Sequence, residues 1–147
     1  MFDNESIARA MFEALNNEDP DKYTDYFADD AEYINTYRQS KNKDEIREEM
    51  HACFNTFTNF RNKIERIFSD GDTVWVEFKY TGEVSGKALV SIMSGFYGEE
   101  EAKNKRARDT VKSFDLPHVY ILDFEDGKVK KWICYYNSDL LVSQLKD

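Results

Sequence analysis

The chain has 147 residues, of which 41% are hydrophobic and 15% aromatic, and its 20 Lys and Arg against 29 Asp and Glu give a net charge of −9. This length predicts one domain, spanning residues 1–147, that buries about 68–70% of the unfolded surface. The acidic balance argues against nucleic acid or an anionic membrane as partner, because both are bound by clustered positive charge. No apolar run approaches a membrane span of about 20 residues, and the acidic N-terminus does not resemble a signal peptide. We therefore expect a cytoplasmic protein.

The first predicted element is an amphipathic helix. Ile7, Met11 and Leu15 recur at four-residue steps, which is the spacing of one helical face. Asp3 or Asn4 is placed to cap the start of this helix.

Two more helices are predicted on either side of a short strand over residues 31–36. Asp19 followed by Pro20 indicates a helix start, and this short helix is expected to run through Phe27. Asn42, backed by Glu45, resembles a capping box and begins a longer helix. Its apolar stripe is Ile46, Met50, Cys53, Phe54 and Phe57.

The second half of the chain has the period of β-strands. Asp70-Gly71 and Asp126-Gly127 each separate two β-rich runs, which is the strongest short-range hairpin signal. The expected antiparallel strands are 61–69 with 73–84, 118–125 with 128–137, and 87–93.

Helices followed by hairpins indicate the α+β class, with the helices on one face of a curled sheet. A charged insertion at about 98–110 interrupts the strand pattern and has no apolar period. We interpret it as a solvated helix or hairpin tip rather than as a basic anchor for an anionic partner, because its glutamates cancel much of the positive field.

Several segments together resemble the nuclear transport factor 2-like superfamily, and within it the SnoaL-like polyketide cyclases and ketosteroid isomerases. The resemblance rests on Ala14-Leu15-Asn16-Asn17-Glu18-Asp19, on Tyr26-Phe27-Ala28-Asp29-Asp30-Ala31, on Phe124-Glu125-Asp126-Gly127-Lys128-Val129, and on Trp132, Tyr135-Tyr136-Asn137 and Leu140-Leu141. It implies a cone-shaped cystatin-like fold, in which helices pack on a strongly bent antiparallel sheet around an apolar pocket, and it implies frequent homodimers. Fold alone does not settle function.

The acidic residues that carry catalysis in those enzymes are absent here. The isomerase base falls at Asn35, whose amide cannot take up a proton at neutral pH. The isomerase tyrosine falls at Met11, and the second oxyanion donor falls near Tyr120. The acid/base Asp of the cyclases falls at Ile133. Whether the chain is an enzyme is therefore left open by its sequence.

Strand alternation and the resemblance together predict which residues line the pocket. If Ile133 faces inward, then Tyr135 and Asn137 do so as well, while His118 and Tyr120 share a face with Leu122 and Phe124. Such a pocket is mainly aromatic and suits a flat, partly apolar molecule. The predicted lining is Tyr33, Asn35, Phe54, Phe78, Tyr80, Ile133, Tyr135 and Asn137.

His118 with Tyr120 is the candidate catalytic pair. A histidine titrating near neutral pH can replace the missing Asp as acid or base, and Tyr120 can donate a hydrogen bond to an oxyanion. We favour the alternative, in which His118 is an orienting residue at the pocket mouth, hydrogen-bonded to the backbone or to a tyrosine. Asn35 either orients a substrate carbonyl or satisfies backbone groups at a strand edge, and the sequence does not decide between these roles.

The remaining chemical motifs are missing. Cys53 and Cys134 lack Cys-x-x-Cys spacing and are expected to be buried free thiols. No metal-ligand cluster, phosphate loop or nucleophile elbow is visible, so we expect no metal or cofactor. Asp29-Asp30 is interpreted as a turn after a helix.

The two tryptophans, Trp75 and Trp132, are predicted to lie on the outer face of the sheet. Large aromatic residues there need a cover, so we expect a homodimer through Trp75, Trp132 and Tyr136.

The sequence thus favours a protein that binds an apolar or aromatic, ketone-bearing small molecule. It would be an isomerase, cyclase or dehydratase with non-standard acid/base residues, or else a non-catalytic carrier or dimerising accessory domain.

Overall fold

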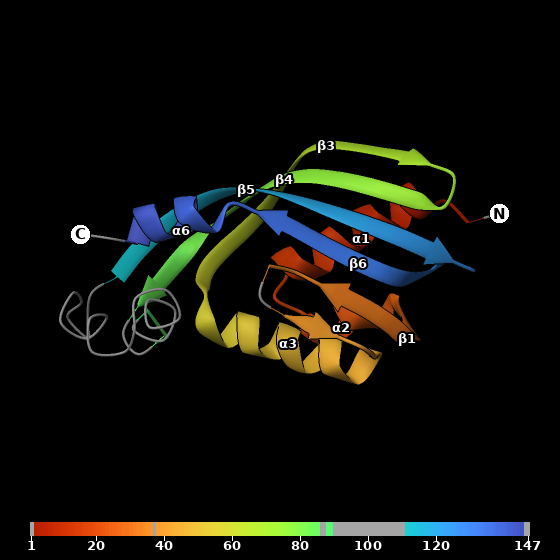
Figure 1. The fold of residues 1–147 in the computed structure, drawn as a ribbon, viewed down its shortest axis with the longest axis horizontal. Coiled ribbons are helices and arrows are strands. Elements are labelled where there is room, and N and C mark those ends of the chain that lie inside the picture. Colours follow the sequence, from red (N-terminus) through yellow and green to blue (C-terminus); the bar gives the residue numbers. More distant parts are fainter. Residues whose placement is uncertain (1, 37, 86–87, 90–110, 146–147) are drawn as a thin grey trace.

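A computed structural model describes residues 2–36, 38–85, 88–89 and 111–145. Within these ranges the chain forms α1 (Asn4–Asn16), α2 (Pro20–Asp25), β1 (Phe27–Ile34), β2 (Gln39–Ser40), α3 (Lys43–Thr56), β3 (Thr58–Asp70), β4 (Thr73–Ser85), β5 (Val111–Glu125), β6 (Lys128–Tyr136) and α6 (Ser138–Leu145). The predicted α+β class is confirmed (Figure 1). None of the helices in the described part of the chain is long and apolar enough to cross a membrane.

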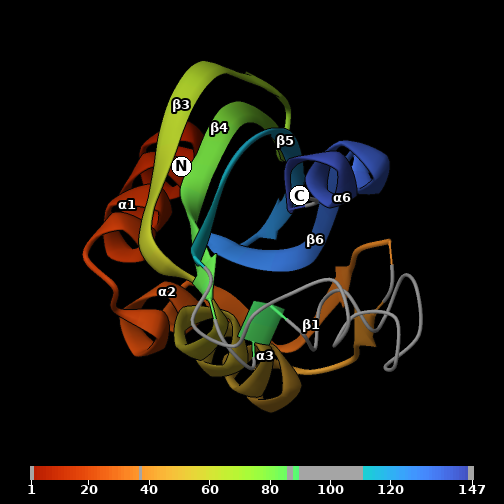
Figure 2. The ribbon, with the colours of Figure 1, turned by 90° about the vertical axis from the view of Figure 1, so that its left-hand side faces the viewer.

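The six described strands form one curved sheet in the order β2-β1-β6-β5-β4-β3. Figure 2 shows the sheet bending around the space beside α1, α2 and α3. The sheet was predicted to be antiparallel, and this is wrong for one pair of strands, because β1 pairs in parallel with β6. Turn residues specify only the hairpins, and no hairpin connects β1 to β6, so the sequence contained no signal for this pairing.

The two predicted hairpins are confirmed. Gly71 at φ 60° joins β3 to β4, and Asp126 and Gly127, at φ 51° and 76°, join β5 to β6. Two successive residues at positive φ are typical of the tight turn whose twist matches that of paired strands. Both hairpins are longer than predicted, since β3 begins at Thr58 and β5 at Val111.

The helix starts also follow the sequence. Asp3 caps α1 by accepting a hydrogen bond from the Ser6 amide, and Asn42 caps α3 by accepting one from the Glu45 amide. A third cap, Asp19, begins α2 directly before Pro20. Each cap satisfies an N–H group that has no partner inside its helix.

Three predicted elements need correction. The helix α2 ends at Asp25 rather than Phe27, so Asp29-Asp30 lies within β1 instead of in a turn. The strand predicted over 87–93 is wrong for Ala88 and Leu89, which are helical, and its other residues lie outside the described ranges. The charged insertion predicted at about 98–110 lies outside them as well.

The main core lies between the inner face of the sheet and the helices α1, α2 and α3. Its largest side chain is Trp132, which is 2% exposed and contacts the rings of Tyr23, Phe27, Tyr33 and Tyr120. A smaller core lies under α6, where Leu141 and Leu145 pack against Phe114 and Leu116. The sequence pattern had not predicted α6. The two cores leave space between them.

Candidate functional site

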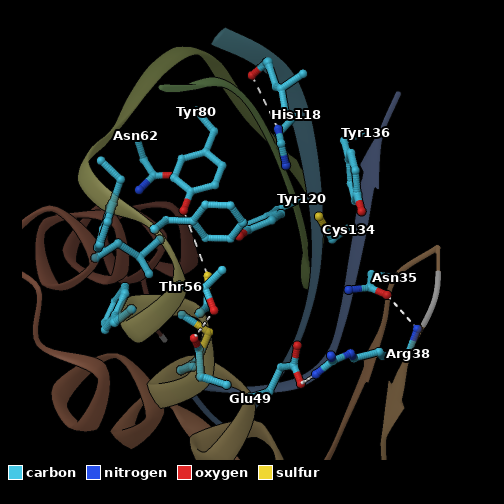
Figure 3. A pocket seen from close by; sticks show the side chains of 18 of the residues that line it. Asn35, Arg38, Glu49, Thr56, Asn62, Tyr80, His118, Tyr120, Cys134 and Tyr136 are labelled. Carbon is cyan, nitrogen blue, oxygen red and sulfur yellow. Dashed lines mark hydrogen bonds and ion pairs between the residues drawn. The ribbon is translucent and has the colours of Figure 1, made fainter. Parts of the chain in front are cut away.

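A cavity of about 480 Å³ lies between the inner face of the sheet and α3. Figure 3 shows it with side chains entering from both sides. A volume of this size is within the range of small-molecule sites. Most of its lining is apolar or aromatic: Leu15, Tyr33, Met50, Ala52, Cys53, Phe54, Phe57, Phe60, Tyr80, Ala88, Phe114, Leu116, Tyr120, Trp132, Cys134, Tyr136 and Leu141.

Four of the eight residues predicted to line the pocket lie at this cavity: Tyr33, Asn35, Phe54 and Tyr80. Phe78 is instead packed beneath it, 1% exposed, with its ring centroid 4.6 Å from that of Tyr120.

The inward face of β6 is opposite to the predicted one. Trp132, Cys134 and Tyr136 line the cavity, whereas Ile133 and Tyr135 point to the outer face, Tyr135 being 58% exposed. A shift of one residue reverses every side chain of a strand. The prediction was wrong because Ile133 was placed at the position of the catalytic Asp of the cyclases. Burying the large indole of Trp132 next to Tyr33 stabilises the fold more than burying Ile133 in its place.

Two consequences follow for the other predicted residues. Asn137 lies beyond β6 and does not reach the cavity, because its Oδ1 accepts a hydrogen bond from the Leu140 amide at the start of α6 (3.1 Å). Trp132 and Tyr136 are not on the outer face, so the predicted dimer contact loses both. Trp75 does lie there, stacked on Phe68 at 5.3 Å between ring centroids.

His118 enters the cavity from β5 (Figure 3). Its ring stacks on Tyr136 at 4.9 Å and 9°, and its Nδ1 lies 3.4 Å from the Leu116 carbonyl. A carbonyl only accepts, so this contact favours the tautomer with hydrogen on Nδ1, which leaves a lone pair on Nε2. Burial lowers the pKa of His118 from 6.5 to about 4. The imidazole is therefore neutral at physiological pH.

Tyr120 lies two residues further along β5, on the same inner face. Burial raises the pKa of its phenol well above 10, so it keeps its proton. No hydrogen bond within the described residues engages its hydroxyl. Tyr120 therefore presents a neutral hydroxyl to the cavity.

The cavity mouth carries polar groups that satisfy one another. Arg38 Nη1 and Glu49 Oε2 form an ion pair at 2.6 Å. Asn35 Oδ1 accepts a hydrogen bond from the Arg38 backbone amide (2.7 Å), and Asn35 Nδ2 donates to the Tyr33 hydroxyl (2.8 Å). Glu49 is the only acidic side chain among the described lining residues, and its charge is balanced.

The interior is uncharged. Burial raises the pKa of the Cys53 thiol to about 11 and that of the Cys134 thiol further still. Both cysteines are free, as predicted. Because every buried titratable group of the described lining is neutral near pH 7, the cavity favours an uncharged ligand.

Four polar lining residues were not predicted from the sequence, namely Arg38, Glu49, Thr56 and Asn62, and Asn62 is the buried one among them. It enters from β3, opposite Tyr80 in the strand register, and is 6% exposed. The alternation of Phe60, Asn62 and Ile64 was visible in the sequence and would have placed Asn62 on the inner face.

A model of the SnoaL-like domain matches residues 8–132. The match covers most of the chain, and the chain belongs to the SnoaL-like domain family of the nuclear transport factor 2-like superfamily, as its motifs had indicated.

Solved structures share the fold along nearly the whole chain. A candidate SnoaL-like polyketide cyclase from Shewanella putrefaciens superposes with a TM-score of 0.75 at 15% identity, covering 99% of this chain and 97% of that one. AclR, a candidate hydroxylase from Streptomyces galilaeus, gives 0.74 at 18% identity, with 97% and 94% covered. A protein with a ketosteroid isomerase-like fold from Catenulispora acidiphila, in complex with trimethylamine, gives 0.71 at 17% identity, with 94% and 90% covered. At these identities the likeness concerns the fold alone.

Among curated proteins, human dynein regulatory complex subunit 7 is 29% identical over 103 residues. The match takes in 54% of this chain but only 12% of that subunit, so the chain spans a small part of its length.

Proposed function

We propose that this protein binds a flat, uncharged, mainly apolar small molecule that carries a carbonyl group. The observation behind the proposal is the 480 Å³ cavity, whose wall is aromatic and whose interior contains the Tyr120 hydroxyl and the Asn62 amide, neither of them hydrogen-bonded by a described residue. Aromatic walls bury flat rings favourably, and a few convergent polar groups fix the orientation of a ligand. The hydroxyl of Tyr120 is the donor proposed for the carbonyl oxygen.

Binding is tested by calorimetric titration with 2-tetralone, a flat apolar ketone. Ala52 lies on α3, lines the cavity and is exposed, so Ala52→Trp is expected to obstruct the mouth without disturbing the core. Asn55→Trp, at an exposed position of α3 outside the lining, is the matched control. We expect Ala52→Trp to weaken binding at least tenfold and Asn55→Trp to leave it unchanged. Equal affinities in both variants would contradict the proposed site.

A second candidate function is proton transfer next to the carbonyl, which is the step common to isomerisation, cyclisation and dehydration of ketones. Two features of His118 favour this function. Its contact with the Leu116 carbonyl leaves a lone pair on Nε2, and His118 lies two residues from Tyr120 on the same face of β5. His118 would accept the proton as a base, and Tyr120 would hydrogen-bond the resulting enolate oxygen. A pKa of about 4 keeps His118 fully in its basic form at pH 7 but makes it a weak base.

Exchange of the α-hydrogens of 2-tetralone in D₂O, followed by NMR, separates catalysis from binding alone. An enzyme accelerates the exchange, and His118→Phe, which keeps the stacking on Tyr136, abolishes the acceleration. Because the pKa of His118 is about 4, the accelerated rate is expected to be independent of pH between about 5.5 and 8. Binding of 2-tetralone without faster exchange supports the non-catalytic carrier.

The outer face of the sheet supports homodimer formation as a further part of the proposal. Phe68, Trp75, Ile121 and Ile133 lie side by side across β3, β4, β5 and β6 and form an apolar row. Phe68 is 56% exposed, and contiguous apolar surface of this kind is typical of interaction sites.

Light scattering at micromolar concentration tests the dimer. The native protein is expected to have twice the mass of one chain, and the Ile121→Lys variant is expected to have the mass of one chain. A native protein of single mass would contradict the dimer.

The proposed location is the cytoplasm. Cys53 and Cys134 are free thiols that line the same cavity, and free thiols persist where the compartment is reducing. Fractionation of cells that express the tagged full chain tests this location.

A further inference from the structure

The side chain of Asn62 is a buried polar group to which no residue of the described part of the chain hydrogen-bonds. Asn62 lies on the inner face of β3, lines the cavity and is 6% exposed. No hydrogen bond within the described residues reaches its side-chain amide. A buried amide without a hydrogen bond destabilises the folded protein. Because this amide faces the cavity, a molecule bound there can supply the partner that the described residues do not.

The backbone of Asn62, in contrast, is fully engaged. Its N–H donates to Asn16 Oδ1 at 2.7 Å, and its carbonyl accepts from Asn16 Nδ2 at 3.0 Å. Asn16 ends α1 and thus takes the place of a neighbouring strand beside β3, which lies at the edge of the sheet. These two bonds fix the position of Asn62, while its side chain is left to face the cavity (Figure 3).

The surroundings of this amide are flat rings. Tyr80 is the partner of Asn62 in the strand register. Among the described residues, the Tyr80 hydroxyl makes one long polar contact, of 3.9 Å, with Cys53 Sγ. Phe54 and Phe60 stack at 4.9 Å and 11° on the same side of the cavity. Burial raises the pKa of the Tyr80 phenol well above 10, so no charge develops here near neutral pH.

We propose that Asn62 is the polar anchor of the ligand site and that it selects a flat, uncharged ring in which an N–H or O–H group adjoins a carbonyl. A carboxamide presents a donor and an acceptor side by side, and its complement is an acceptor and a donor on adjacent atoms, as in a lactam or an enol beside a ketone. This inference rests on the proposed function and names the ligand class for the same cavity.

Three probes of similar size test the inference on the full chain: 2-quinolinone, which is a lactam, N-methyl-2-quinolinone, which lacks the donor, and naphthalene, which lacks both groups. We expect the native protein to bind 2-quinolinone about tenfold more tightly than either other probe, because it can make two hydrogen bonds to the Asn62 amide, whereas N-methyl-2-quinolinone can make one and naphthalene none. In Asn62→Leu the three affinities are expected to become similar, with naphthalene binding retained. Asn55→Leu, on the exposed side of α3, is expected to behave as the native protein.

Each outcome decides the matter. Loss of the preference in Asn62→Leu, together with a higher thermal midpoint of the ligand-free variant, supports the anchor. Binding of all three probes with equal affinity to the native protein overturns the inference and leaves the proposed function standing, and this comparison needs no variant to fold. A preference that persists in Asn62→Leu also overturns it. Failure of the native protein to bind any of the three probes overturns the inference and the proposed function together.

Discussion

The cavity has two asparagines, and they differ in what their side chains do. At the mouth, Asn35 is bonded through its oxygen to the Arg38 amide and through its nitrogen to the Tyr33 hydroxyl. In the interior, Asn62 is more deeply buried and no such bond within the described residues reaches its amide. Hydrogen bonds made inside the chain stabilise the fold, whereas a buried polar group without one lowers stability and is available to a ligand. The mouth is therefore built for structure and the interior for recognition.

The largest expected effect on stability comes from His118, another polar residue of the interior. Its pKa is about 4 in the folded protein and 6.5 in the unfolded chain, so the unfolded state binds more protons between these values. Stability is thus fully present above pH 6.5 and falls as the pH drops toward 4. Between pH 7.5 and pH 5 the loss is about 2 kcal/mol. Urea unfolding at both values measures it.

The matched variants isolate this effect from other titrating groups. His118→Gln is expected to remove most of the loss between pH 7.5 and pH 5, while His51→Gln, at the exposed histidine bonded to Asp21, is expected to retain it. A native protein that loses no more stability between pH 7.5 and pH 5 than the His118→Gln variant does would show that His118 is not held in its neutral form.

The two asparagines are expected to respond in opposite directions to the same substitution. Asn35→Leu removes the hydrogen bonds from the Arg38 amide and to the Tyr33 hydroxyl, for a loss of about 1–2 kcal/mol. Asn62→Leu removes a buried amide to which no described residue hydrogen-bonds, for an expected gain of about 1 kcal/mol. Chemical denaturation of both variants checks the signs. A loss in both would place Asn62 among the structural residues.

The smallest effect is expected at the ion pair of the mouth. The Arg38 side chain is 62% exposed, and pairs at such exposure contribute less than about 1 kcal/mol. Glu49→Gln is thus expected to change the free energy of unfolding by about 0.5 kcal/mol or less, with the difference vanishing in 1 M NaCl. A larger change that persists in salt would show that the mouth is more rigid than its exposure indicates.

Much of the fold was predictable because its signals are local. Caps such as Asp3 and Asn42, and the Asp-Gly turns, act within a few residues, so the sequence contains all that is needed to place them. The parallel pairing of β1 with β6 was not predictable, since it depends on how distant segments pack.

The site was predicted in part, for a related reason. His118, Tyr120, Tyr33 and Tyr80 lie at the cavity because alternation along their strands could be read correctly. The residues of β6 that line the cavity were predicted wrongly, because the resemblance of Ile133 to the catalytic position of the cyclases was given more weight than the burial of Trp132. Asn62 was passed over because its significance depends on which residues hydrogen-bond to its amide, and only the packed structure reveals that none of the described residues does.

The measurement closest to the central claim is a calorimetric titration of the native protein with 2-quinolinone and, in parallel, with naphthalene. We expect saturable binding of one molecule of each compound per chain, with 2-quinolinone bound about tenfold more tightly than naphthalene. Absence of saturable binding by both would contradict the claim that the cavity is a ligand site for flat, uncharged molecules.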